Sequence, residues 1–159
     1  MIDTTTAQRR VLRFESPAEA LAEVDRIAAA ERAGTLTRTG NWSAGQAIGH
    51  LASWINYGFD GYPVAAPPDL AERAQARKPM ALREGLRVGF HIPGVAGGTA
   101  GIEALEIGEA VSRYRRAFAR LQAGTPGHPH PFFGPLTNEE WMLLHLRHAE
   151  LHLGFQHPQ

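Results

Sequence analysis

Histidines are the residues of this chain whose type and spacing could do chemistry. His148 and His152 are four residues apart, so on a helix their imidazoles project from one face and can bind the same metal ion. His145 lies one turn before His148. His50 occurs in an earlier segment of helical periodicity and is the natural third ligand. Three imidazoles on one divalent ion would leave positions open for water or a substrate.

A structural cluster of histidines is the competing interpretation. In a chain with eight histidines, random placement produces about 0.4 pairs at this spacing, so the pair alone is weak support. His148 and His152 also share one sector of their helix with four large apolar residues, Trp141, Leu144, Leu151 and Phe155. Imidazoles facing a core need partners for their ring nitrogens, which either a metal or hydrogen bonds can provide. The residues alone leave both interpretations open.

Four amphipathic helices are expected to position these side chains. Ser16, Ser43 and Thr137 can each cap a helix, and each is followed three residues later by Glu or Gln. We find no alternating pattern strong enough for a sheet. The sequence therefore predicts an all-α protein, a four-helix bundle. Apolar residues recur with the helical period over residues 16–34, 43–61, 102–122 and 137–155.

The segment between the second and third helices, residues 61–101, is the least regular part of the chain. It is rich in Pro, Gly and Arg, and only residues 69–76 have helical character. We expect a long irregular insertion, which either covers one end of the bundle as a lid or forms a variable surface segment. The length of 159 residues is typical of one domain, so residues 1–159 are expected to form a single bundle domain.

Composition narrows the classes of function. The 16 basic and 16 acidic residues balance, so we expect no basic surface for nucleic acid. Cysteine is absent, which excludes thiolate ligands and a cysteine nucleophile. No apolar run reaches the length of about 18 residues needed to span a membrane. Residues 1–10 lack the apolar stretch of a signal peptide, so we expect a cytoplasmic protein without membrane contact.

Other residues that could do chemistry are expected to have ordinary structural roles. Trp54, one turn from His50, is expected to pack in the core, with pocket lining as the alternative. The arginines of the third helix are expected to form a solvated face. The remaining histidines lie in loops or at the C-terminus and are expected on the surface: His91, His128, His130 and His157.

Three segments together resemble the DinB/YfiT-like superfamily of four-helix bundles, within a branch known only as a domain of unknown function. They are Asn41–Leu51, His130–Trp141 and Leu144–Leu153. The resemblance implies that His50, His148 and His152 bind a divalent metal, nickel, zinc or iron. It also implies a chemistry that uses low-molecular-weight thiols in some members, and frequent dimerisation. Leu151 stands where that branch often has another histidine, and Gly154-Phe155-Gln156 replaces a usual Arg-Gln.

Two hypotheses of function follow. In the first, the triad holds a metal for a thiol-dependent transferase or a hydrolase acting on a small substrate, with His145 and Tyr57 as candidates for proton transfer or substrate orientation. In the second, the protein is a non-catalytic structural or stress-related homodimer whose histidines are structural. The last helix has a second apolar stripe, which indicates either a central helix or a second chain covering it: Met142, Leu146, Ala149 and Leu153.

Overall fold

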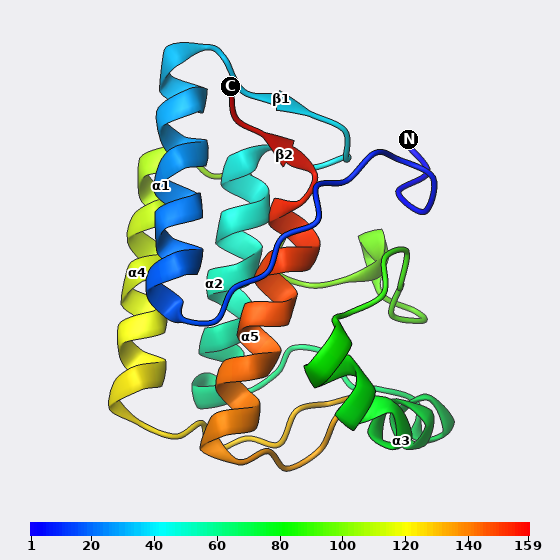
Figure 1. Ribbon diagram of the computed structural model, residues 1–159. Helices are drawn as coiled ribbons and strands as arrows, with labels where there is room; N and C mark the ends of the chain where they lie inside the picture. Colours follow the sequence, from blue (N-terminus) through cyan, green and yellow to red (C-terminus); the bar gives the residue numbers. More distant parts are fainter.

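Five α-helices dominate the computed structural model, which describes residues 1–159. Four of them, α1, α2, α4 and α5, run side by side, and α3 crosses beside α5 near one end (Figure 1). The only strands, β1 and β2, are two residues long and pair antiparallel. The bounds are α1 (Pro17–Ala33), β1 (Thr37–Arg38), α2 (Ala44–Asp60), α3 (Pro68–Glu84), α4 (Ile107–Ala123), α5 (Asn138–Leu153) and β2 (Gln156–His157), with one 3₁₀ turn at Ala96–Gly98.

The predicted helix starts are confirmed at three caps. Ser16 accepts a hydrogen bond from the backbone of Glu19, and Ser43 and Thr137 each form a complete capping box. The predicted end of the first helix is confirmed as well, because Gly34 follows α1 in the left-handed conformation with φ +72°. Local side-chain chemistry therefore sets the start of these three helices.

Helix α5 packs against three other helices, α1, α2 and α3. The second apolar stripe of this helix is buried in the main core, where Leu146, Ala149 and Leu153 are at most 1% exposed. The core around it contains Tyr114 and Phe118 of α4, whose rings meet edge to face. The chain's own helices thus cover this stripe, and it does not require a second chain. On the face of α5 that carries the histidines, Trp141 and Leu144 belong to this core, whereas His148 and His152 line a cavity.

Two predicted helix boundaries are wrong. Helix α4 begins at Ile107 rather than near residue 102, because Glu106 caps it and residues 101–106 are irregular chain. Leu105 packs there on Gly45 and Gly49, where an added Cβ would meet it at 2.0 and 2.7 Å. Helix α5 ends at Leu153 rather than near residue 155, because the chain turns into β2 and pairs with β1.

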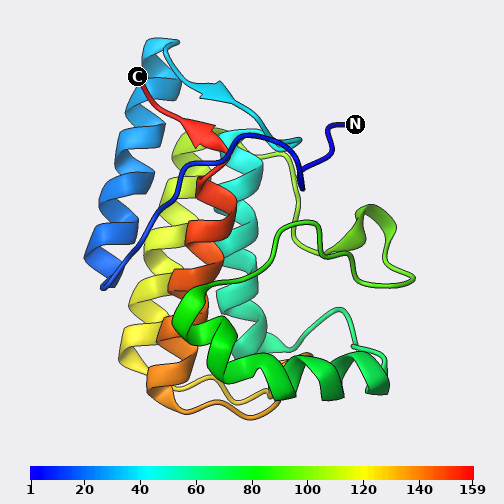
Figure 2. The ribbon, with the colours of Figure 1, turned by 45° about the vertical axis from the view of Figure 1, so that its right-hand side comes forward.

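The prediction of an irregular insertion is also wrong in part. A short helix was expected over 69–76, but α3 has 17 residues and continues through Pro79. Only Leu82 of this helix is buried, so the helix needs few apolar residues on its inner face. For this reason the apolar periodicity predicted only a short part of α3. The guanidinium of Arg147 on α5 donates to the Leu82 carbonyl at 3.0 Å, and Lys78 pairs with Glu140 at 3.0 Å. In Figure 2, α3 bends, as a helix with an internal proline does.

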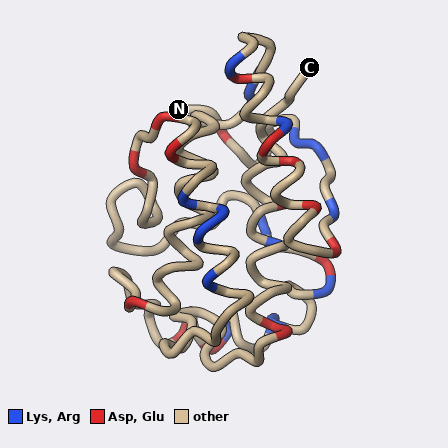
Figure 3. Tube along the Cα trace, turned by 90° about the vertical axis from the view of Figure 1, so that its left-hand side faces the viewer, with Lys and Arg blue, Asp and Glu red and all other residues tan.

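Charged side chains on the outer helices have mixed signs. Figure 3 shows basic and acidic residues interspersed over the face that contains α1 and α4. On α4, Arg113 pairs with Glu109 at 2.8 Å, and Arg120 pairs with Asp60 on α2 at 2.6 Å. The expected solvated face of arginines on this helix is confirmed. None of the helices combines the length and the apolar composition that a membrane span needs.

Candidate metal centre

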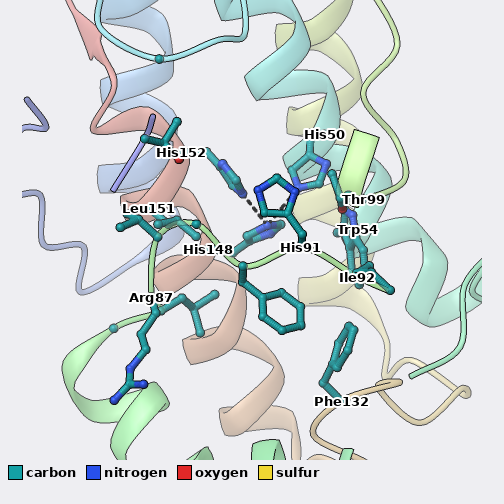
Figure 4. Close-up of a pocket in the computed structure, with 18 of the residues that line it drawn as sticks. His50, Trp54, Arg87, His91, Ile92, Thr99, Phe132, His148, Leu151 and His152 are labelled. Carbon is teal, nitrogen blue, oxygen red and sulfur yellow. Dashed lines mark hydrogen bonds between the residues drawn. The ribbon is translucent and has the colours of Figure 1, made fainter. Parts of the chain in front are cut away.

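Three imidazoles from two helices meet at one point. His148 Nε2 lies 3.1 Å from His50 Nε2 and 3.0 Å from His152 Nε2. All three potential ligand atoms lie within 4.8 Å of one another. Figure 4 shows the rings pointing toward each other, one from α2 and two from successive turns of α5. The structure thus brings together the three residues that the sequence indicated as a ligand set.

The protonation state of His50 suits a metal ligand. Its Nδ1 lies 2.9 Å from the carbonyl oxygen of Ala100. A carbonyl only accepts hydrogen bonds, so Nδ1 donates and Nε2 of the neutral ring carries the lone pair. A backbone carbonyl in this position is a common way of orienting a metal-binding imidazole. Gly101 makes the approach possible, because its φ of +74° turns the chain and an added Cβ would lie 2.8 Å from the Ser53 Cβ.

Burial keeps the three imidazoles neutral, which is the form that binds metals. Burial lowers the pKa of His50 to about 4, against weaker opposing effects from the Ala100 and Gly101 backbone. Burial, reinforced by neighbouring imidazoles, lowers the pKa values of His148 and His152 well below their ordinary value. At neutral pH each ring therefore offers a lone pair rather than a positive charge.

Two of the three separations between the ring nitrogens fit one divalent ion, and the third is at most 4.8 Å. Metal–nitrogen bonds of about 2.0–2.1 Å place neighbouring ligand nitrogens about 2.9–3.4 Å apart in octahedral or tetrahedral coordination. The separations of 3.1 and 3.0 Å around His148 fall in this range. Nitrogen-only donors suit nickel, zinc and iron better than calcium or magnesium. His50, His148 and His152 therefore suit the divalent nickel, zinc or iron ion that the family resemblance implies.

Two tryptophan rings flank the imidazoles of the triad. The Trp42 ring stacks on His152 with centroids 4.8 Å apart and an interplanar angle of 28°, and it lies 4.8 Å from the His50 ring. On the other side the Trp54 indole donates to the same Ala100 oxygen as His50, at 3.1 Å. Trp54 also lines the cavity described below, which the sequence analysis held open as its alternative role. The role of Trp42 was missed, because it comes from a loop with no periodicity.

A cavity of about 1170 Å³ opens onto the triad. It lies between the histidine face of α5, the α3 region and the loop that follows it (Figure 4). Much of its wall is apolar, including Ile92 and Phe132, and His91 also lines it. The insertion that connects α2 to α4 therefore forms one side of a cavity whose other side holds the three imidazoles. A ligand in the cavity would have access to them.

The two candidates for proton transfer lie in different places. His145 lines the cavity, is 3% exposed and stacks on Trp141 at 5.9 Å, and its Nε2 has no hydrogen-bond partner. Burial lowers its pKa to about 3. Tyr57 is not among the residues that line the cavity, and burial raises its pKa. Of the two, only His145 is placed to contact a ligand beside the triad.

One of the four histidines expected on the surface is buried. His130 is 7% exposed and lines the cavity, because residues 130–134 fold back on themselves through two backbone hydrogen bonds between His130 and Gly134. Of the other three, His91 and His128 are exposed, and His157 is half-buried with its ring 2.9 Å from the Thr39 hydroxyl. Proximity to proline indicated a loop correctly, but it could not indicate that the loop faces inward.

Glu150 takes part in a separate buried network with residues outside the triad. Its carboxylate accepts a hydrogen bond from the Phe14 amide at 2.8 Å and pairs with Arg147, whose side chain is 3% exposed. Arg13 completes the group at 3.4 Å. The network joins α5 to the N-terminal segment and, through Leu82, to α3. It supports the helix that holds two of the three imidazoles.

The fold and site define a class: a mainly helical protein with a histidine triad, compatible with a metal site, at the wall of a large cavity. His50 of the triad is buried, and His148 and His152 are half-buried. The chain belongs to the family described as "Protein of unknown function (DUF1569)", whose model matches residues 6–159. No curated protein and no solved structure matches the chain.

Proposed function

We propose that this protein is a metal-dependent enzyme, a thiol-dependent transferase or a hydrolase, that acts on a small molecule bound in the cavity. His50, His148 and His152 would hold one divalent ion, nickel, zinc or iron. The observation that carries the proposal is the convergence of three neutral imidazole nitrogens at the wall of a cavity of about 1170 Å³. A bound divalent ion would lower the pKa of a water or thiol, so that a nucleophile exists at neutral pH.

The protein's own residues would prepare the site in three ways. Ala100 fixes the tautomer of His50, and the Trp42 and Trp54 rings shield the imidazoles from water. His145, neutral at working pH, would act as a hydrogen-bond partner for the substrate rather than as a strong base. The proposal gives Tyr57 no role, because it does not line the cavity.

We also propose that α1, α2, α4 and α5 form a four-helix bundle of the DinB/YfiT-like kind, with α3 as an insertion. The side-by-side course of these helices and the placement of the triad on α2 and α5 support this relationship. A homodimer and a cytoplasmic location remain predictions. Light scattering on the purified protein checks the first of them.

The alternative function is a non-catalytic bundle whose histidines are structural. One observation favours it: a proton on His148 Nε2 could be donated to the lone pair of His50 Nε2 at 3.1 Å, or to His152 Nε2 at 3.0 Å, so these separations also fit hydrogen bonds between the rings. The two functions differ in a measurable property. An enzyme needs an exchangeable ligand on its metal, whereas a structural histidine cluster needs no metal.

Cobalt substitution tests the proposal. The protein is loaded with Co²⁺, and ethanethiol is added while the visible and near-ultraviolet spectrum is recorded. A thiolate-to-cobalt band that rises with thiol concentration and is missing in His148→Ala supports the enzyme. The absence of both a cobalt spectrum and any band with thiol would contradict it and favour the structural cluster.

A further inference from the structure

The tautomer of His130 is fixed by its own loop. Its Nδ1 accepts hydrogen bonds from the backbone amides of Phe132 at 3.1 Å and Phe133 at 3.2 Å. An imidazole nitrogen that accepts from two N–H groups carries no proton, so in the neutral ring the proton is on Nε2. Burial lowers the pKa of His130 to about 3, which keeps the ring neutral at physiological pH. His130 therefore presents a permanent N–H donor.

That donor has no partner within the protein. No side chain or carbonyl accepts from Nε2 of His130, although the residue is 7% exposed and lines the cavity. The Nε2 atom is not fully enclosed by protein, so at the cavity wall its proton can be donated to water or to an acceptor on a bound ligand. Next to it, His145 is also buried, lines the cavity and has an unpaired Nε2. The wall thus holds a second pair of polar side chains besides the triad.

The His130 ring is held in place with little freedom. The hydrogen bonds between His130 and Gly134, at 3.0 and 2.8 Å, close the loop that carries it. Its ring packs among Trp54 at 5.8 Å, Phe133 at 5.2 Å and Trp141 at 6.2 Å between centroids. A donor fixed before binding loses little entropy when a ligand arrives, which is what a recognition group requires.

Trp54 connects this donor to the triad. Its ring centroid lies 6.0 Å from that of His50 and 5.8 Å from that of His130. A molecule that reaches from the triad to His130 would thus pass an aromatic and otherwise apolar wall that includes Phe132. The charges along the cavity favour an anion, since Arg73, Arg77 and Arg87 line it against Asp3 and Glu84.

We propose that His130 is a second anchoring point for the substrate, whose Nε2–H donates a hydrogen bond to a carbonyl or carboxylate oxygen. The substrate class is a small molecule with a metal-binding donor atom at one end and such an oxygen at the other, joined by a short apolar spacer. The proposal deepens the proposed function and rests on it for the first anchoring point. His145 forms the adjacent wall of this second site.

The variant His130→Asn isolates the donor. An asparagine oxygen can accept from the amide two residues further along the chain, as Nδ1 does here, so the loop keeps its internal support. The variant nevertheless lacks a group at the position of Nε2. His128→Asn is the matched control, because His128 is exposed two residues away and does not line the cavity. Circular dichroism and cobalt content show whether both variants keep the fold and the triad.

The test compares two series of ligands on the cobalt-loaded protein. One series is ω-mercaptocarboxylates of two to six carbons, and the other is alkanethiols of the same lengths. For at least one spacer length the acid should bind the parent protein about tenfold more tightly than the matching alkanethiol, the size expected of one good hydrogen bond. His130→Asn should remove that advantage and leave alkanethiol affinity unchanged, and His128→Asn should change neither. Equal affinities of acid and alkanethiol, or an advantage that survives in His130→Asn, would overturn the proposal.

A second readout separates this inference from the metal site. In metal-free protein labelled with ¹⁵N-histidine, long-range correlation spectra report which nitrogen of His130 carries the proton. The Nε2–H tautomer and a shift of its resonance on adding butyrate support the second anchoring point even if no metal binds. The Nδ1–H tautomer, or no shift at saturating butyrate, contradicts it. Failure of the proposed function appears separately, as a parent protein that binds no metal.

Discussion

The imidazole of His50 and the indole of Trp54, one turn apart on α2, donate to a single acceptor, the carbonyl oxygen of Ala100. The distances are 2.9 and 3.1 Å. This shared acceptor ties the chain between α3 and α4 to the triad, and it sets both the tautomer of His50 and the orientation of the cavity wall. The loop around Ala100 is thus part of the candidate site through this carbonyl, in addition to Thr99 and Ile102, which line the cavity.

Substituting Gly101 should disturb the site through that loop. Gly101→Ala places a Cβ at a φ of +74° and 2.8 Å from the Ser53 Cβ, so the Ala100 oxygen must move. We expect metal affinity to fall about 10- to 100-fold, as for loss of an outer hydrogen bond to a metal-binding histidine. Stability should fall by about 1–2 kcal/mol. Competition with a chromophoric chelator measures the affinity.

Gly34→Ala is the control for that experiment. Gly34 has a similar φ of +72°, but no atom lies within 4 Å of its added Cβ, and it follows α1 far from the triad along the chain. It should lose similar stability and keep full metal affinity. An equal loss of affinity in both variants would mean that general destabilisation, rather than the Ala100 contact, explains the effect.

Tryptophan fluorescence should report metal binding. Trp42 stacks on His152 at 4.8 Å, so a paramagnetic ion such as Ni²⁺ bound by the triad would quench its emission. We expect saturable quenching in the parent and a smaller change in Trp42→Phe, in which Trp54, 6.1 Å from the His148 ring, is still quenched. No quenching is expected in His148→Ala. Quenching that persists undiminished in His148→Ala would place the ion elsewhere.

Acid should destabilise the metal-free protein. Burial lowers the pKa of His50 to about 4 and the pKa values of His130 and His145 to about 3. Below the ordinary value near 6.5 the unfolded chain binds protons that the folded protein does not, so the free energy of unfolding falls as pH decreases from about 6.5 toward 4. Above pH 6.5 this contribution to stability is complete. Urea unfolding at a series of pH values measures the trend.

The variant His145→Phe gives that measurement a control. Phenylalanine keeps a ring against Trp141 and removes one titrating group as well as the unpaired Nε2. The loss of stability between pH 6.5 and 4 should become smaller than in the parent. A stability that stays constant over this interval in the parent would contradict the burial of neutral imidazoles.

The network behind α5 should matter more for stability than surface ion pairs do. Arg147→Met leaves the buried Glu150 carboxylate without its closest partner and removes the hydrogen bond to Leu82, so we expect a loss of about 3–5 kcal/mol. Arg73→Met, which breaks the exposed pair with Asp69, should cost less than about 1 kcal/mol. Urea unfolding of both variants compares them. Similar small losses would show that the buried pair adds little.

Local signals account for what the sequence could predict. Ser16, Ser43 and Thr137 set helix starts through contacts within four residues, and the spacing of His148 and His152 follows from helix geometry. The helical pattern around His50 indicated it as the third ligand, and the family resemblance strengthened that interpretation. These features depend on neighbours in sequence or on a motif, so they can be predicted before the fold is known.

The features that the sequence did not predict depend on contacts between segments that are distant along the chain. The Ala100 carbonyl and the Trp42 ring reach the triad from irregular chain, for which periodicity offers no signal. His130 is buried because its loop turns inward, which a neighbouring proline does not reveal. Most of α3 was missed because an internal proline and an exposed surface hide a helix that docks through Leu82.

Metal content tests the central claim most directly. The untagged protein, with His50→Ala and His148→Ala prepared alongside, is incubated with nickel, zinc and iron salts, desalted and measured by inductively coupled plasma mass spectrometry. The account predicts close to one equivalent of one of these metals in the parent and little in either variant, with helical circular dichroism retained in all three. No metal in the parent, or full occupancy in His148→Ala, would contradict it.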